Sequence, residues 1–439
     1  MRAFFLLALV AMAPAAVPAT AQMPSAPAAP VHGRAVVGAM QKLLGEHYVL
    51  PEVRPKFDAM LAKGLAAGRY DVSDAKELAN RLNEDLRTVT PDKHLGVMYD
   101  PETSAKLAAA GPGAGADDAP PTAADIADAK RRNSGLVQMR ILPGNIRYLE
   151  TDGFVWAGEV TERAYDDAMR FLSGGDAVII DMRKNGGGDP AAVRYLVSHF
   201  LAPNTKLMTF YMGSNRVDTT AALPRTIAPR MVGKPLYVLT SRGTASAAEE
   251  FTGHVAGYKL GELIGENTAG AGFRNQFYSL PDGLLISISV GQAVLASTGK
   301  GWEAVGFAPN TAVSVDQSLE VAEAHALKHL ASTAPPGKRR LLEVQAAMLL
   351  AKTAPVKTAL NPAAYAGVYG ERTVRSEAGL LTIERAGGPT SKLVAIGPNQ
   401  FAYENDPGAT VTFDVAGDRA TALHLVRSDG STADGTRTQ

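Results

Sequence analysis

Residues 177–188 read AVIIDMRKNGGG, a short apolar run followed at once by a polar, glycine-rich turn. An unbroken apolar run of this length is typical of a strand that is buried on both faces, as in a parallel sheet. The glycines allow backbone conformations closed to other residues and let N–H groups face a ligand. Alone, the motif is most simply a plain turn. Its spacing matches neither common phosphate-binding loop, so a nucleotide site is not expected.

Strand and helix patterns alternate on both sides of this run. Upstream, residues 160–172 carry apolar side chains four apart, which predicts a helix. Downstream, Asp189-Pro190 is a typical helix start, residues 236–239 predict a second buried strand, and residues 284–290 alternate cleanly. We therefore predict an α/β core over residues 135–332.

Two further folded units are expected beside this core. Residues 34–100 carry runs of apolar residues at helical spacing and predict a small helical domain. Residues 361–439 carry short alternating runs between Gly, Pro and Asp-Gly turns, which predict a small all-β domain. Residues 101–134 are rich in Ala, Gly and Pro without an apolar period and predict a linker. Residues 333–360 predict a helix and a second linker.

Residues 1–21 have the layout of a secretory signal peptide. Met1-Arg2 is positively charged, the next residues are almost wholly apolar, and Ala19-Thr20-Ala21 offers a small-residue cleavage site. We predict cleavage after Ala21, a flexible leader over residues 22–33, and export to the periplasm. No later apolar stretch is long enough for a membrane helix.

The composition excludes several kinds of chemistry. The 439 residues contain no Cys, so disulfides, thiolate catalysis and a Cys-based zinc site are impossible. Lys+Arg and Asp+Glu both total 44, which gives no net charge to attract nucleic acid or an anionic membrane. We expect no cofactor and no metal.

A second junction, residues 239–251, reads LTSRGTASAAEEF. A strand ends there, a turn of small residues follows, and Ser246 opens a helix. A serine in that place is most often only an N-cap. However, the flanking alanines leave the hydroxyl accessible, and the helix N-terminus offers N–H groups to a developing oxyanion. Ser246 is thus a candidate nucleophile, outside the G-x-S-x-G elbow of α/β-hydrolases.

A nucleophilic serine needs a base, and the chain contains 8 His. Most lie in the leader, in the β region or on predicted helices, where packing or solvation explains them. His254 lies two turns past Ser246 on the same helix, too far to reach its hydroxyl. His94 remains, in TPDKHL at the end of the helical region. Glu303, beside Trp302 on a Gly/Pro-containing turn, is either a solvated charge or a hydrogen-bond acceptor.

Four motifs occur together in a set order: DMRKNGGG (181–188), TSRGTASAAEEF (240–251), GENTAGAGF (265–273) and GWEAVGFAPN (301–310). Together they resemble the tail-specific, or C-terminal processing, serine protease family. The most similar branch contains interphotoreceptor retinoid-binding protein and the bacterial proteins like it, and the tricorn protease core is more distantly similar. The likeness covers roughly residues 34–330.

The resemblance implies a crotonase/Clp-protease-like α/β core and places the reacting groups by position. Ser246 matches the family nucleophile. Many members use a lysine base, but that position holds Ala271 here, so a Ser–Lys dyad is unavailable. Histidine-using members place their base before the core and a glutamate in a W-E-G-x-G-x-x-P-D motif, which implies His94 and Glu303.

The resemblance also implies an oxyanion hole and shows departures from the family pattern. The oxyanion donors correspond to the N–H groups of Gly187 or Gly188 and Ala247. Ala304 replaces the Gly after the glutamate and Asn310 replaces the final Asp, changes that could shift the loop holding Glu303. The PDZ domain of many members is not expected here.

These implications favour a secreted serine endopeptidase that hydrolyses peptide bonds of a peptide or protein substrate through an acyl-enzyme. Two alternatives remain. One is a non-catalytic or weakly catalytic binder of apolar ligands on the same fold. The other is a small-molecule esterase or amidase, which the same residues would serve.

Overall fold

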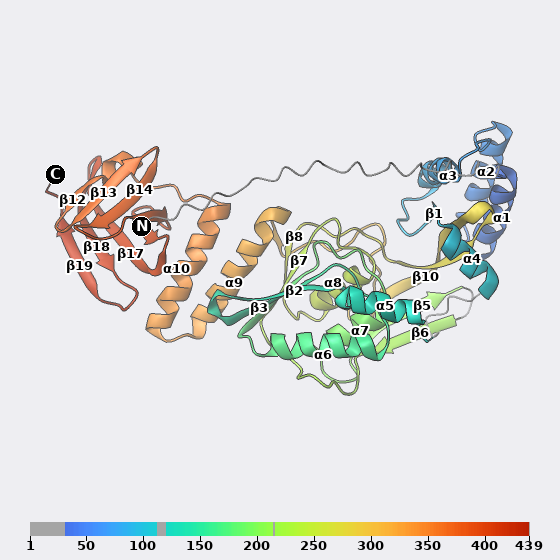
Figure 1. The fold of residues 1–439 in the computed structure, drawn as a ribbon, viewed down its shortest axis with the longest axis horizontal. Helices are drawn as coiled ribbons and strands as arrows, with labels where there is room; N and C mark the ends of the chain where they lie inside the picture. Colours follow the sequence, from blue (N-terminus) through green and yellow to red (C-terminus); the bar gives the residue numbers. More distant parts are fainter. Residues whose placement is uncertain (1–30, 112–119, 214–215, 439) are drawn as a thin grey trace, which may run out of the picture.

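The computed structural model describes residues 31–111, 120–213 and 216–438 and arranges them as three units in a row (Figure 1). A helical unit comes first, an α/β core second and an all-β unit last, which confirms the predicted fold class. The predicted signal peptide and nearly all of the leader lie outside the described residues. Among the described helices, none is long and apolar enough to cross a membrane.

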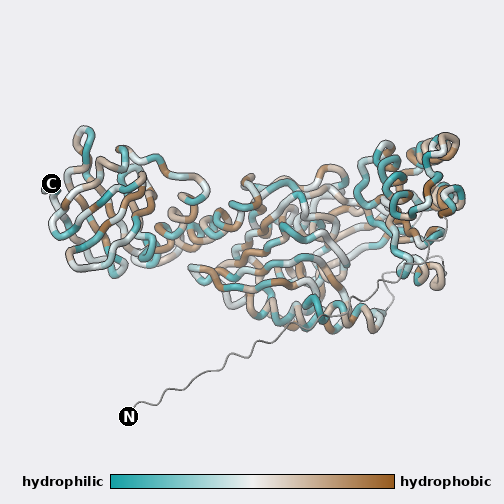
Figure 2. The backbone as a smooth tube through the Cα atoms, turned by 45° about the horizontal axis from the view of Figure 1, so that its top comes forward, coloured by the Kyte–Doolittle hydropathy of each residue, from teal (hydrophilic) through white to brown (hydrophobic). Residues whose placement is uncertain are grey.

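Each unit has its own apolar interior. Figure 2 shows apolar stretches recurring in all three units, and the buried side chains form separate clusters in the helical unit, on the two faces of the core sheet, and in the β unit. Because burial of apolar surface is the main force for folding, the apolar interior of each unit contributes separately to the stability of the protein.

The helical unit packs its apolar faces on one strand of the core. It consists of α1 (Gly33–His47), α2 (Arg54–Ala66) and α3 (Ala75–Val89). Asp74 caps α3 by accepting a hydrogen bond from the Glu77 N–H. The buried faces of these helices meet Leu284, Ile286 and Ile288 of β10 (Leu284–Leu295).

Strand β10 runs from the helical unit into the core. Its first residues pair antiparallel with β1 (Gly96–Tyr99), and its last residues pair with β5 (Lys206–Met212). The same sheet holds β6 (Arg216–Ala221) beside β5 and β9 (Phe273–Ser279) beside β10. β10 therefore joins the segment that follows His94 to the core.

The side chain of Asn83 ties α3 to β1. Its Nδ2 donates to the Val97 carbonyl at 2.7 Å, and its Oδ1 accepts from the Val97 N–H at 2.7 Å. These two bonds tie the middle of α3 to the start of β1, on either side of the loop that carries His94.

The core is a 6-stranded sheet in the order β11-β8-β7-β4-β3-β2, parallel except for β2. Successive residues of β4 point to opposite faces and all are buried, as predicted for residues 177–180. The strands are β2 (Leu136–Leu142), β3 (Ile146–Thr151), β4 (Ala177–Asp181), β7 (Leu236–Thr240), β8 (Glu262–Gly265) and β11 (Thr311–Ala312).

Helices cover both faces of this sheet. One face packs against α6 (Glu159–Ser173), α7 (Pro190–Ser198) and α8 (Ala247–Gly257). The other packs against α9 (Ser318–Thr333) and α10 (Pro336–Thr353). Figure 1 shows α9 and α10 between the sheet and the C-terminal unit.

The linker prediction for residues 101–134 is wrong where the structure describes them. They form α4 (Pro101–Ala110) and α5 (Ala123–Arg131). Asp100 caps α4, and Thr122 with Asp125 forms a capping box at α5. Alanine favours helix, and the side chain of Ser104 bonds to backbone carbonyls of the β9–β10 turn. Local capping and the Ser104 contact favour helices here although the segment lacks an apolar period.

The C-terminal unit is a barrel-like antiparallel sheet of 8 strands taken in chain order. A bridge between Tyr369 and Arg437 brings the end of the chain back to the first strand. The rings of Tyr365, Tyr369, Phe401 and Phe413 fill the interior. Its strands are β12 (Gly367–Tyr369), β13 (Arg372–Glu377), β14 (Leu380–Arg385), β15 (Ser391–Ala395), β16 (Gln400–Tyr403), β17 (Asp406–Ala416), β18 (Arg419–Val426) and β19 (Thr432–Thr436).

Candidate active site

Ser246 lies at the sharp turn between β7 and α8. Its φ of 53° and ψ of −120° lie in a region that side-chain-bearing residues rarely adopt. Holding a serine there costs on the order of 1–3 kcal/mol, which the surrounding contacts must supply. Strained residues of this kind cluster at functional sites.

The fully buried carboxylate of Glu249 holds this turn in place. Its Oε2 accepts from the N–H groups of Ser246 (3.0 Å) and Ala271 (2.7 Å). Its Oε1 accepts from Thr268 Oγ1 and the Gly270 N–H, both at 2.6 Å. One anion thus ties the serine turn to residues 268–271. The sequence analysis missed Glu249, although a Glu three residues after a Ser at a helix start is a capping-box signal.

The glycine-rich turn packs directly against Ser246. Gly187 has a φ of 108°, and a Cβ on it would lie 2.8 Å from the Ser246 Cβ, so only glycine fits. The Gly187 N–H donates to Asn185 Oδ1 at 2.9 Å, while the Asn185 carbonyl accepts from Ala245. The oxyanion role expected of Gly187 does not fit this geometry, because its N–H is already bonded.

His94 reaches Ser246 from the other unit. Its Nε2 lies 3.0 Å from Ser246 Oγ, although the two residues are 152 positions apart in the chain. The His94 N–H donates to Asp92 Oδ1 at 2.9 Å, and the Lys93 ammonium donates to the Ala269 carbonyl. These bonds fix the loop of His94 against the loop that Glu249 holds.

The surroundings of His94 keep its ring neutral. Burial lowers the pKa of His94 from its usual value, and the negative charges of Asp92 and Glu249 oppose this shift without reversing it. A neutral imidazole can carry its proton on Nδ1 and accept another at Nε2. The ring therefore suits the removal of the Ser246 proton at neutral pH.

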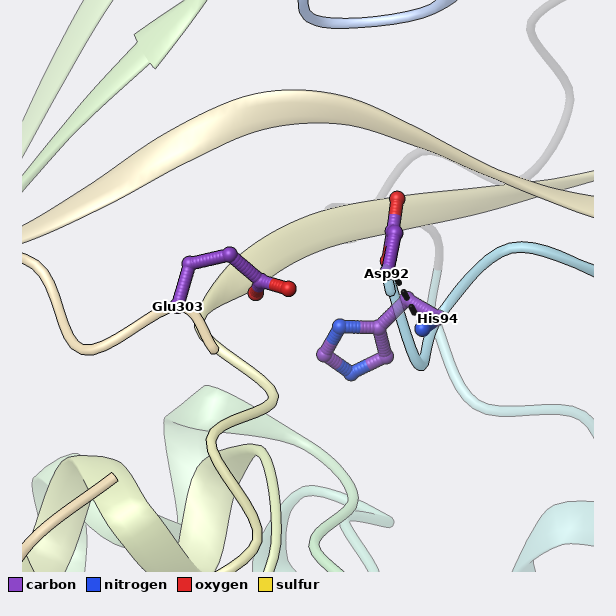
Figure 3. A group of neighbouring side chains, drawn as sticks. All are labelled: Asp92, His94 and Glu303. Carbon is purple, nitrogen blue, oxygen red and sulfur yellow. Dashed lines mark hydrogen bonds between the residues drawn. The ribbon is translucent and has the colours of Figure 1, made fainter. Parts of the chain in front are cut away.

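The carboxyl group of Glu303 lies behind the His94 ring, together with that of Asp92 (Figure 3). Glu303 Oε2 accepts from the N–H groups of Gly272 (2.6 Å) and Phe273 (2.9 Å). Its Oε1, like His94 Nδ1, is buried without a hydrogen-bond partner among the described residues. The structure thus brings Ser246, His94 and Glu303 into one site but leaves the contact between His94 and Glu303 open.

Burial raises the pKa of Glu303 to about 7. The hydrogen bond from the Gly272 N–H lowers this pKa, and the one from the Phe273 N–H lowers it less. The charge of Asp92 raises it, and that of Glu249 raises it less. The carboxyl group therefore gains its negative charge close to neutral pH, much later than an exposed glutamate does.

The departures from the family pattern leave the Glu303 loop in a defined position. Ala304 keeps a φ of 61°, the left-handed conformation that its Gly counterpart adopts freely, and its N–H donates to the Gly270 carbonyl at 2.9 Å. Asn310 Oδ1 accepts from the Leu263 N–H at 2.8 Å, a bond an Asp would also make. Trp302 donates to the Ala271 carbonyl at 3.1 Å.

A cavity of about 540 Å³ opens beside Ser246. Gly188 and Ala247 line it next to the serine, so the two predicted oxyanion donors other than Gly187 border the space where a carbonyl would sit. Its apolar walls come from Phe210, Met212, Phe273, Val290, Ala293 and Trp302. The apolar part of the lining suits an apolar side chain, while charged residues, among them Arg216, Glu250 and Arg274, line the rest of the cavity.

Comparison with known families covers both the helical unit and the core. Residues 145–313 match the model described as peptidase family S41. Residues 31–139 match the model described as the N-terminal domain of peptidase S41 in eukaryotic IRBP. The chain belongs to peptidase family S41. The recognition made from the four motifs is thereby confirmed.

Known relatives of this S41 chain include processing proteases. A carboxyl-terminal-processing protease of Synechocystis is 28% identical over 143 residues, 31% of this chain and 32% of that protein. A chloroplastic C-terminal processing peptidase of Tetradesmus obliquus is 33% identical over 133 residues, 30% of this chain and 28% of that protein. These alignments span a third or less of the relatives' length. A lipoprotein structure from Streptococcus agalactiae matches 70% of this chain and 98% of its own at 16% identity, with a TM-score of 0.48.

Removal of the Glu249 carboxylate should destabilise the core strongly. Glu249→Ala leaves four buried donors without a partner, which we expect to lower the free energy of unfolding by about 3–5 kcal/mol. Urea unfolding followed by tryptophan fluorescence measures this, since Trp156 and Trp302 are the 2 tryptophans and both belong to the core.

Glu159→Ala is the matched control, because Glu159 is exposed on α6 and pairs only with the exposed Arg163. We expect it to change stability by less than about 0.5 kcal/mol. Equal effects of the two substitutions would contradict the role given to Glu249.

Proposed function

We propose that this S41 protein is a serine endopeptidase that cleaves peptide bonds through an acyl-enzyme on Ser246. The observation that carries the proposal is the 3.0 Å contact between His94 Nε2 and Ser246 Oγ. A base within hydrogen-bond reach of a strained, cavity-facing serine is the arrangement that nucleophilic catalysis needs.

In the proposed cycle His94 Nε2 takes the Ser246 proton while Oγ attacks the carbonyl carbon of the scissile bond. The carbonyl oxygen becomes an oxyanion, which the N–H groups of Gly188 and Ala247 stabilise at the N-terminus of α8. His94 then gives its proton to the leaving amine, and the acyl-enzyme forms. A water molecule, deprotonated by His94, releases the acyl group and restores Ser246.

Glu303 stabilises the imidazolium that exists between these proton transfers. Its negative charge lies behind the His94 ring, on the side of Nδ1, and favours the tautomer with Nε2 free to accept. Because its Oε1 has no partner among the described residues, one bridging water can link it to Nδ1.

The substrate side of the site combines apolar walls with the charged side chains of Asp189, Arg216, Glu250 and Arg274. The cavity beside Ser246 has room for one large side chain and brings Phe210, Met212 and Trp302 around it. We therefore propose that the enzyme accepts peptide or protein substrates with an apolar residue next to the cleaved bond.

Substitution of Ser246 and His94 tests the proposed nucleophile and base. We expect Ser246→Ala to lower peptide hydrolysis on the order of 10⁴–10⁶-fold with the fold unchanged, since no other group can form the acyl-enzyme. A fluorophosphonate probe should label Ser246, as located by mass spectrometry, and the labelling should be lost in His94→Ala.

His329→Ala serves as the control for the labelling, because it removes an exposed imidazole on α9. Labelling that persists in His94→Ala would count against the base. Labelling without peptide hydrolysis would point to the small-molecule esterase, and neither labelling nor hydrolysis to the apolar binder.

The raised pKa of Glu303 predicts a pH dependence. His94 is neutral at and above pH 7 because its pKa is lowered, so the acid limb of kcat/KM should follow the ionisation of Glu303 and rise with pH through about 7. Glu303→Gln should lower kcat/KM on the order of 10²–10⁴-fold and remove this rise. The profile is measured in the presence of a chelator.

Glu159→Gln, on the exposed face of α6, should keep the profile of the unchanged protein. A rise near pH 7 that survives in Glu303→Gln would assign it to another group.

We also propose that the protein is secreted, to the periplasm. The support comes from residues 1–21, where a charged start, an apolar stretch and Ala19-Thr20-Ala21 follow one another. N-terminal sequencing of the protein purified from its natural compartment should begin at Gln22. A sequence that begins at Met1 would overturn this localisation.

A further inference from the structure

Three side chains of kinds that commonly bind metal ions lie close together: His94 and two carboxylates beside its ring. Asp92, His94 and Glu303 each bring one ligand atom to within 4.8 Å of the other two, and Figure 3 shows both carboxylates on one side of the ring. Within residues 31–111, 120–213 and 216–438 no other such group of His, Asp and Glu is found.

The atoms that face one another in this cluster have unused bonding capacity. Asp92 Oδ2, His94 Nδ1 and Glu303 Oε1 are all buried without a hydrogen-bond partner among the described residues. Asp92 is only 6% exposed. Tyr48 lies beside Asp92: burial raises the pKa of its phenol most, the charge of Asp92 adds to the rise, and a weaker hydrogen bond to the Asp92 carboxylate adds further. Buried polar atoms are rarely left without a partner, so the cluster calls for a ligand.

The other oxygen of each carboxylate is already bonded, which keeps the free one in place. Asp92 Oδ1 accepts from the His94 N–H, and Glu303 Oε2 accepts from Gly272 and Phe273. Two anionic oxygens and a ring nitrogen are thus presented to the same point. A water molecule can bond all three only when the ring proton is on Nδ1, because it then accepts from Nδ1–H and donates to both carboxylates; when the proton is on Nε2, a cation can bind all three acceptors at once.

We propose that Asp92, His94 and Glu303 form a binding site for a divalent transition-metal ion of the Zn²⁺ type, and that the bound ion switches off the catalytic base. One imidazole and two carboxylates suit Zn²⁺, whereas Mg²⁺ and Ca²⁺ prefer oxygen ligands alone. Tetrahedral bonds of about 2.0–2.2 Å place ligand atoms about 3.4 Å apart, so atoms within 4.8 Å of one another need to move inward by about 0.8 Å at most.

The inhibition follows from the tautomer of His94, and it rests on the proposed peptidase function. A metal ion on Nδ1 uses the lone pair of that nitrogen, so the single proton of the neutral ring must reside on Nε2. Nε2 then donates to Ser246 Oγ and can no longer accept its proton. The ion also binds the Glu303 charge that would otherwise stabilise the imidazolium.

Calorimetric titration of the full-length Ser246→Ala protein with Zn²⁺ tests the site without relying on activity. The variant keeps all three ligands, so we expect one ion per chain and no binding of Mg²⁺. In the Ser246→Ala background, Asp92→Asn and Glu303→Gln should each weaken Zn²⁺ binding by at least about 10–100-fold, the loss found when even a hydrogen-bonding partner of a ligand is removed.

His424→Ala in the same background is the matched control. His424 lies 2.9 Å from both Asp414 and Asp434 on the surface of the barrel, so it is a second histidine between two carboxylates. We expect its removal to leave the binding unchanged. Absence of Zn²⁺ binding, binding that survives Asp92→Asn and Glu303→Gln, or binding that is lost in His424→Ala would each overturn the proposal.

Peptide hydrolysis by the unchanged protein supplies the second measurement. Zn²⁺ should inhibit it with the affinity found by calorimetry, and a chelator should restore it. Tight binding to Asp92, His94 and Glu303 without inhibition would overturn the switch. A protein that binds Zn²⁺ there but hydrolyses no peptide would refute the peptidase function and leave the metal site standing.

Discussion

The site depends on one buried anion. Ser246 can keep its strained conformation only because the carboxylate of Glu249 binds its N–H and the loop at residues 268–271 together. A lone carboxylate in the interior would be costly, but four donors offset the loss of water. A carbonyl of the same loop accepts a hydrogen bond from Lys93, the residue before His94. The positions of Ser246 and His94, the proposed nucleophile and base, are thus linked through Glu249.

Charge is distributed unevenly around the ring of His94. Glu249 is fully bonded, while Asp92 and Glu303 each keep one oxygen without a partner among the described residues. Burial lowers the pKa of the imidazole and raises that of Glu303, so base and carboxyl group change charge in different pH ranges. This separation lets a neutral base and a negatively charged partner coexist above pH 7, as acid–base catalysis requires.

Much of the fold and the main reacting residues could be predicted from the sequence, because strong local patterns carry them. Residues 177–180 form the doubly buried strand, and Ser246 and His94 meet as their motifs imply. Other features depend on contacts that no local pattern shows. Helices α4 and α5 form through caps, and the N–H of Gly187 turns toward Asn185. The open contact of Glu303 depends on side-chain placement in three dimensions.

Strand β10 gives this architecture a modular character. It carries β1 and the helical unit at one end and a wall of the substrate cavity, through Val290 and Ala293, at the other. The proposed nucleophile and base therefore belong to different units, and neither unit holds both. On the proposed mechanism the helical unit acts like a subunit that is covalently joined to the core: a core without it would retain the proposed oxyanion donors and nucleophile but lack the base.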